Sequence, residues 1–148
     1  MPRVLIMLVG LCFYLEVEAF PCFLTLVKDS CWTNYDLVVM VTDPTTEKVL
    51  TTVTVPQGTS WGRQQFTCQP GETLALSASF SPLFWETDKG KTYAAQHSWS
   101  LPTTITKGDT AWNITVCYPK EFSEVPFPPN ASGDCKCDTD HIPPVKPQ

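Results

Sequence analysis

The sequence predicts an all-β fold, an antiparallel β-sandwich of about seven strands. Three observations support this fold class. Short segments alternate apolar and polar residues with the period of two that strands show, turn residues separate these segments every 8 to 14 positions, and no segment repeats apolar residues at helical spacing. A small barrel is the alternative architecture for the same pattern.

The expected strands follow from the alternation along the chain. A short apolar segment around residues 24–27 is interpreted as an edge strand or an extended lead-in. Residues 35–42 carry apolar side chains on both faces, which is typical of a central strand that is covered twice. Turn chemistry at 43–46 then returns the chain into 48–55, which we interpret as the second arm of a hairpin.

Four further segments complete the predicted sandwich. Residues 63–69 form a strand that stops at a Pro-Gly turn, and 72–80 show the cleanest alternation in the chain. Residues 83–85 and 91–101 flank turn residues and predict a second hairpin, and 111–118 form the last strand. The inward residues of the most regular strand are expected to be Leu74, Leu76, Ala78 and Phe80.

The N-terminus predicts a secretory signal peptide that is cut after Ala19. Arg3 precedes an apolar run over 4–15, and Val17 and Ala19 are the small or short apolar residues that a signal peptidase reads. A signal anchor is the competing interpretation, but a run of about 12 residues is short of the roughly 20 that span a bilayer as a helix. We therefore expect a secreted, extracellular product.

The mature chain is expected to hold one domain and a tail. Residues 1–19 are the signal peptide, 20–118 the β-sandwich domain, and 119–148 a Pro-rich extended tail with seven of the 14 prolines.

Removing the signal peptide takes away one positive and two negative charges, so the formal net charge changes from −5 to −4. Arg63 is the only mature arginine, and without a basic stripe we expect no nucleic-acid partner. The sequence contains no second long apolar run, so we expect no transmembrane segment.

The mature chain keeps an even number of cysteines, which in an oxidising compartment predicts three disulfides. Cys135 and Cys137 are separated by one residue and are too close to pair with each other without strain. Our preference is one of them joined to Cys117 and the other to Cys22 or Cys31, which leaves alternatives open. The six cysteines are Cys22, Cys31, Cys68, Cys117, Cys135 and Cys137.

Two Asn-X-Ser/Thr acceptors predict N-glycosylation at Asn113 and Asn130. In the last strand, alternation places Asn113 and Cys117 on one face, opposite Val116. Because a glycan must lie in water, this face is expected to be the outer one. The sequence therefore predicts that the glycan and the cross-link at Cys117 share an outer surface.

The spacing of Cys68, Trp85 and Cys117, with an Asp-Thr-Ala run at 109–111, loosely resembles an immunoglobulin domain, in which an inter-sheet disulfide packs on a buried tryptophan. The pattern departs from that family in two ways. Cys68 is expected to face inward and Cys117 outward, and Thr115 stands where the family has a tyrosine. The resemblance implies an immunoglobulin-like architecture by analogy, without family membership.

Candidate catalytic residues are few, so we expect a protein that is not an enzyme. His97 lies next to Ser98, but adjacent strand residues point to opposite faces and no nucleophile elbow surrounds the serine. Glu86 and Asp88 could serve as a carboxylate pair, yet they lie at a turn where solvated side chains are expected.

The tail also contains residues of the types that bind metal ions. Residues 135–141 contain two cysteines, two aspartates and a histidine. In a secreted protein these cysteines are expected to form disulfides, and the carboxylates lack the glycine and the distal glutamate of a calcium loop. We therefore expect no metal and no cofactor.

Aromatic residues provide the main indication of function. Trp85, Trp99 and Trp112 lie in predicted strands and are interpreted as packing residues. Trp61 lies in a glycine-containing loop two residues before Arg63, and these two residue types are enriched at binding hot spots. The sequence predicts a non-catalytic extracellular module that binds a protein partner, a receptor or a ligand, through Trp61 and Arg63. The alternative is a lectin-like or lipid-surface-binding sandwich that uses exposed tryptophans.

Overall fold

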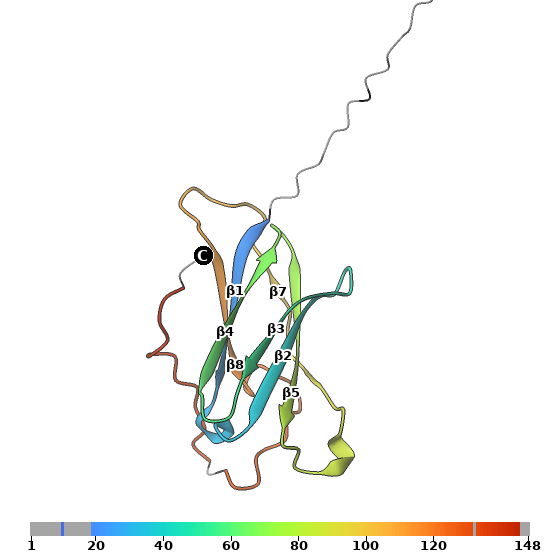
Figure 1. Cartoon of the computed structure of the whole chain (residues 1–148), viewed down its shortest axis with the longest axis vertical. Coiled ribbons are helices and arrows are strands. Elements are labelled where there is room, and N and C mark those ends of the chain that lie inside the picture. Colours follow the sequence, from blue (N-terminus) through green and yellow to red (C-terminus); the bar gives the residue numbers. More distant parts are fainter. Residues whose placement is uncertain (1–9, 11–18, 132, 146–148) are drawn as a thin grey trace, which may run out of the picture.

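The computed structural model describes residues 10, 19–131 and 133–145 of the 148-residue chain. Its strands form two sheets, and within the described part of the chain the helical elements are two short 3-10 turns. The two sheets pack against each other with their strands running lengthwise (Figure 1). The predicted all-β sandwich is therefore confirmed, whereas nearly all of the predicted signal peptide lies outside the described residues.

The three-stranded sheet has the order β4-β1-β8, with β1 antiparallel to β4 and parallel to β8. These strands span Phe20–Lys28 (β1), Trp61–Cys68 (β4) and Trp112–Tyr118 (β8). β1 is thus a middle strand, so the prediction of an edge strand around residues 24–27 is wrong. Its two neighbours come from distant parts of the chain, so alternation within the strand gave no sign of them. β1 is buried at eight of its nine positions, as expected for a strand covered on both faces.

The larger sheet has the order β3-β2-β5-β6, and β7 also pairs with β5. Its strands span Asp36–Asp43 (β2), Lys48–Val55 (β3), Thr73–Ser81 (β5), Tyr93–Ala94 (β6) and Trp99–Ser100 (β7). The β2–β3 hairpin is present as predicted. The second hairpin is wrong, because β6 and β7 are two residues long and each pairs with β5 instead of with a strand from 83–85.

β2 is central in its sheet but is covered on one face only. Leu37, Val39 and Val41 are fully buried, whereas Met40 on the opposite face is 38% exposed. The expectation of a strand covered twice is therefore wrong. An apolar residue at a half-exposed sheet position is common, and alternation alone does not reveal whether a second layer exists.

The core lies between the sheets and takes one face of each strand. Its inward residues on β5 are those expected from the alternation. The largest contributors among the strands are Leu24, Leu26, Leu37, Val39, Val41, Val53, Val55, Leu74, Leu76, Phe80, Val116 and Tyr118.

An aromatic cluster closes one end of this core around Trp32. Trp32 ends the 3-10 turn η1 (Ser30–Trp32), which begins after Asp29, whose carboxylate accepts a hydrogen bond from the Cys31 amide at 2.9 Å. The Trp32 ring centroid lies 4.8 Å from that of Phe80 and 4.9 Å from that of Tyr118. We use the name aromatic cluster for Trp32, Tyr35, Phe80, Phe84, Tyr93, Tyr118 and Phe122.

Two tyrosine hydroxyls in this cluster, those of Tyr93 and Tyr118, are buried and have no hydrogen-bond partner among the described residues. Burial raises the pKa of both; the charge of Asp88 adds to the rise at Tyr93, and Tyr93 and Asp29 add to that at Tyr118.

We expect neither tyrosine to ionise in the folded protein at its ordinary pKa of about 10. Because the unfolded chain loses these protons first, stability should fall as the pH rises above about 10. Near-ultraviolet absorbance titration of the wild type against Tyr93→Phe and Tyr118→Phe tests this. A reversible ionisation step near pH 10, with native circular dichroism, that disappears in either variant contradicts it.

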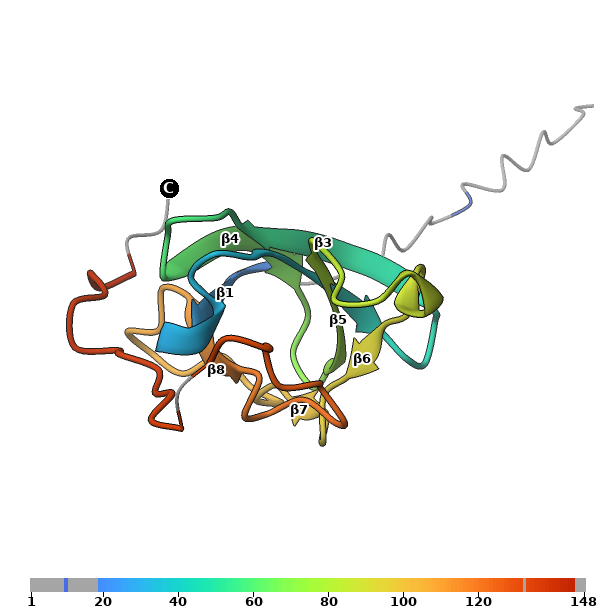
Figure 2. The same cartoon turned by 90° about the horizontal axis from the view of Figure 1, so that it is seen from below.

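Three disulfides link the strands and the tail. Cys22–Cys68 joins the adjacent strands β1 and β4 inside the three-stranded sheet, and both residues are 1% exposed. The other two bridges, Cys31–Cys135 and Cys117–Cys137, attach the tail to the sandwich. This is a connectivity that the sequence favoured. Both views show the red C-terminal segment on the outer side of the three-stranded sheet (Figures 1 and 2).

Candidate functional site

The predicted contact residues Trp61 and Arg63 both lie in strand β4. The loop position expected for Trp61 is therefore wrong, whereas Arg63 lies in a strand as expected. The glycine between them marks a close approach of two strands, because a Cβ on Gly62 would meet the Thr54 carbonyl oxygen at 2.9 Å. The Arg63 guanidinium lies 5.3 Å from the centre of the Trp61 ring, and both side chains are half-buried. The pair is therefore a stacked surface feature of the three-stranded sheet.

Arg63 is also engaged by a row of hydrogen bonds that crosses this sheet. Its Nε donates to Thr25 Oγ1 at 2.7 Å, and Thr25 Oγ1 donates to Asn113 Oδ1 at 2.8 Å. The Asn113 amide in turn donates to Thr115 Oγ1 at 3.1 Å. Because Thr25 is fully buried beneath its neighbours, the row satisfies polar atoms that water does not reach.

The outward direction of the last strand agrees with the alternation. Asn113 and Thr115 are exposed, Val116 and Tyr118 are buried, and Cys117 bonds to the tail instead of spanning the core. A glycan on Asn113 would therefore lie beside the Trp61 and Arg63 pair. Asn130, the second predicted acceptor, is exposed at a small polar cleft of about 230 Å³ formed with η1.

The most exposed tryptophan among the described residues is Trp85, which the sequence placed in a strand. It lies in the loop between β5 and β6, residues 82–92, and is 56% exposed; Leu83 in the same loop is 36% exposed. Phe84 between them is half-buried, with its ring centroid 5.0 Å from that of Phe80. The loop thus presents two apolar side chains to solvent while the residue between them is held in the aromatic cluster.

Successive turns fix the shape of the 82–92 loop. The 3-10 turn η2 (Glu86–Asp88) begins after Trp85, whose carbonyl accepts from the Asp88 amide at 3.1 Å. Lys91 donates from its amide to the Asp88 carbonyl at 3.0 Å, and Gly90 has the positive φ of 80° that favours glycine. Figures 1 and 2 show this yellow-green loop projecting beyond the sheets.

The residues considered for catalysis lie in two segments, Glu86 and Asp88 in η2 and His97 between β6 and β7. Glu86 is exposed and Asp88 half-buried in η2, as expected for turn residues. His97 is exposed, and its ring centroid lies 4.2 Å from that of Trp99. The ring contact that the structure gives to His97 is therefore with the indole of Trp99.

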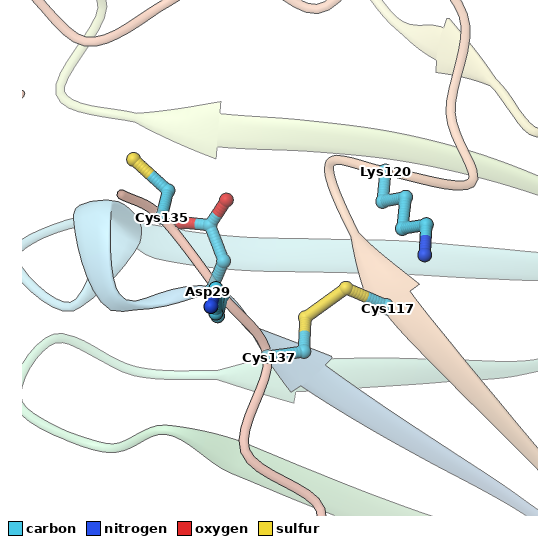
Figure 3. A pocket seen from close by; sticks show the side chains of 6 residues that line it. Asp29, Cys117, Lys120, Cys135 and Cys137 are labelled. Atoms are coloured by element: carbon cyan, nitrogen blue, oxygen red, sulfur yellow. A yellow bond between two sulfur atoms is a disulfide. The ribbon is translucent and has the colours of Figure 1, made fainter. Parts of the chain in front are cut away.

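A larger cleft of about 530 Å³ opens where the tail is attached, and we name it the disulfide cleft. Figure 3 shows the Asp29 carboxylate and the Cys135 sulfur on one side and the Cys117–Cys137 bridge with the Lys120 side chain on the other. Asp29 is only 8% exposed, and burial raises the pKa of its carboxyl, against the lowering effect of the Cys31 amide. The lining residues are Asp29, Cys117, Lys120, Cys135, Lys136 and Cys137.

The chemistry of this cleft is unsuited to a metal ion. One Asp29 carboxylate oxygen and the sulfurs of Cys31 and Cys135 lie within 4.8 Å of one another. The two sulfurs are bonded to each other, however, and zinc requires thiolates. Farther along the tail, Asp138 and His141 form an exposed pair with 3.7 Å between carboxylate oxygen and Nε2.

No family model matches this chain, and no match was found among the curated proteins or the solved structures. The residues that suggested an immunoglobulin-like architecture do not form the buried site of that family, because Cys68 bonds to Cys22 within one sheet and Trp85 is 56% exposed. Within the described residues, no helix is long and apolar enough to cross a membrane.

Proposed function

We propose that this protein is a secreted, N-glycosylated, non-catalytic binding module that holds an extracellular protein partner at its 82–92 loop. The observation that carries the proposal is Trp85, 56% exposed beside Leu83 on a loop anchored through Phe84. Leaving a tryptophan in water forgoes the large favourable burial of its surface, and tryptophan is enriched among the residues that dominate binding energy.

Loop rigidity supports the same assignment. A partner that binds a preformed loop does not have to order it, so less of the interaction energy is lost. The turns through Asp88 and Lys91 and the packing of Phe84 supply that order before binding.

Trp61 and Arg63 support this role less well. Arg63 already donates to Thr25 and stacks on Trp61, so a partner would have to compete with contacts inside the molecule. A glycan on Asn113 would also crowd that surface. The pair therefore serves as a matched test of which tryptophan binds.

Binding should fall about tenfold or more in Trp85→Ala and stay within about twofold in Trp61→Ala. Labelled multimers of the glycosylated protein would be screened against cells that display extracellular domains of membrane proteins, and binding constants would be measured for the positive domains. Trp85 is exposed, so the free energy of unfolding should change by about 1 kcal/mol at most.

Glycan arrays and phosphatidylcholine–phosphatidylserine vesicles separate this function from a lectin-like or lipid-binding one. Binding confined to sugars or vesicles, and lost in Trp85→Ala, would replace the protein partner with that ligand class. Equal binding of the wild type and Trp85→Ala to a protein domain would contradict the proposed site.

A further inference from the structure

The two bridges of the tail meet at one short segment, Cys135-Lys136-Cys137, and both are open to the disulfide cleft. Cys135 lines this cleft, and its partner Cys31 lines the neighbouring polar cleft next to Asn130. Both residues of this bridge are half-buried, and each lines a cleft at the surface. The Cys22–Cys68 bridge, by contrast, is 1% exposed at each residue.

We propose that Cys31–Cys135 is a thiol–disulfide exchange site that reacts with external thiols, with Asp29 as the group that protonates the departing sulfur. The geometry of the carboxyl carries this inference. An Asp29 carboxylate oxygen lies within 4.8 Å of both sulfurs of the bridge. The Cys31 amide fixes the position of this carboxylate by donating a hydrogen bond to Asp29 Oδ1 at 2.9 Å.

Charges at the cleft favour an incoming thiolate. Lys120 and Lys136 line it, and within the described part of the chain no carboxylate forms an ion pair with either ammonium group. Reactive cysteines typically lie in such electropositive, partly exposed surroundings, because the thiolate is the nucleophile. Burial raises the pKa of Asp29, so a larger fraction of its carboxyl groups retains the proton needed for transfer.

The Cys117–Cys137 bridge lines the same cleft but has surroundings that oppose negative charge on sulfur. The Cys137 sulfur lies 3.5 Å from the Val27 carbonyl oxygen and 3.7 Å from that of Tyr118. The Glu121 carboxylate accepts from the Cys117 amide at 2.6 Å. Since these oxygens carry negative charge or partial charge, they disfavour a departing thiolate there.

A dithiol serves as the reductant, and with it the atoms and electrons of the exchange balance. A thiolate of the dithiol attacks Cys135 Sγ, the bond to Cys31 Sγ breaks, and the electron pair leaves with Cys31, which takes the proton of Asp29. The second thiol gives its proton to Asp29 and attacks the sulfur of its own molecule in the mixed disulfide. Cys135 leaves as a thiolate, the dithiol becomes a cyclic disulfide, and two electrons have passed to the protein.

Limited reduction with dithiothreitol under native conditions, followed by alkylation and peptide mass spectrometry, tests the order of opening. Cys31–Cys135 should open first, by about tenfold in rate over Cys117–Cys137, while Cys22–Cys68 stays closed. Faster opening of either other bridge, or simultaneous opening of all three, overturns the proposal.

Asp29→Asn separates proton transfer from a structural role. Asparagine retains an acceptor for the Cys31 amide but has no acidic proton, so opening of Cys31–Cys135 should slow about tenfold. A variant that merely loosened the fold would open all of its bridges faster. An unchanged or increased rate at Cys31–Cys135 therefore counts against Asp29 as the proton donor.

The role of the lysines has its own readout. In Lys136→Gln, exchange with glutathione should slow severalfold relative to exchange with 2-mercaptoethanol, because the glutathione thiolate carries more negative charge than the thiolate of 2-mercaptoethanol. Lys107→Gln, at an exposed turn, is the matched control and should leave this ratio unchanged. An equal ratio in the wild type and both variants contradicts the electropositive cleft.

Discussion

Replacing Trp32 with alanine is expected to lower the free energy of unfolding by about 3 to 5 kcal/mol. Trp32 is 1% exposed and contacts Tyr35, Phe80, Phe84 and Tyr118 in the aromatic cluster. Truncation removes the burial of the indole and leaves a cavity that the surrounding rings fill only in part. Because single domains are stable by only about 5 to 15 kcal/mol, this is a large fraction of the total.

Urea unfolding followed by far-ultraviolet circular dichroism measures the loss, with the disulfides intact. Trp85→Ala is the matched control for removing an indole, and Trp32→Phe should lie between the wild type and Trp32→Ala. A loss below about 1 kcal/mol in Trp32→Ala would mean that the cluster collapses onto the space, and the packing argument would then fail.

Replacing Lys28 with methionine is expected to lower the free energy of unfolding by about 2 kcal/mol at neutral pH. Lys28 is 1% exposed, and its ammonium donates to the carbonyl oxygens of Tyr35 at 2.7 Å and of Pro56 at 2.9 Å. Methionine has a similar length but no donor, so the Tyr35 carbonyl loses this partner and the Pro56 carbonyl keeps only its bonds from Thr59. Relief of the cost of burying a charge offsets part of this loss.

The pH dependence follows from the direction of the pKa shift. Burial lowers the pKa of Lys28 below 10.5, against the raising effect of the Asp36 charge. The unfolded chain therefore holds this proton more tightly than the folded protein does, and the contribution of Lys28 to stability becomes more favourable as the pH rises toward 10.5. Methionine does not titrate, so the difference between the wild type and Lys28→Met should widen over that range.

Urea unfolding at neutral pH and at a pH just below the ordinary lysine pKa checks both statements. Lys89→Met, at an exposed position, should stay within about 0.5 kcal/mol of the wild type. If Lys28→Met were as stable as the wild type, the cost of burying the ammonium would outweigh its two hydrogen bonds.

Alternation was a sound guide where one strand face is buried and the other is not. The predicted bounds 48–55 are those of β3, and the inward residues of β5 are as expected. It also placed Cys117 outward, which favoured a link to one of the two tail cysteines, and the structure shows that this cysteine is Cys137. These are properties of a strand and its immediate neighbours, and they are encoded within a few residues.

The alternation within a strand does not reveal which distant strand it pairs with. The parallel pairing of β1 with β8 and the middle position of β1 depend on contacts over more than 80 residues. Trp85 was missed because Leu83-Phe84-Trp85 has the composition of a strand, although only Phe84 packs inward. The turn residues that follow, Lys89-Gly90, were the one local sign of a projecting loop.

The position of β1 between β4 and β8 also sets the order in which the three-stranded sheet can be completed as the chain is synthesised. β1 is synthesised first, yet its last neighbour, Trp112–Tyr118, is synthesised near the end. Cys22 can meet Cys68 once β4 has emerged, whereas Cys31 must wait for Cys135. Until β8 has been synthesised, the apolar β1 segment has one unpaired edge, and such an edge can pair wrongly with another chain.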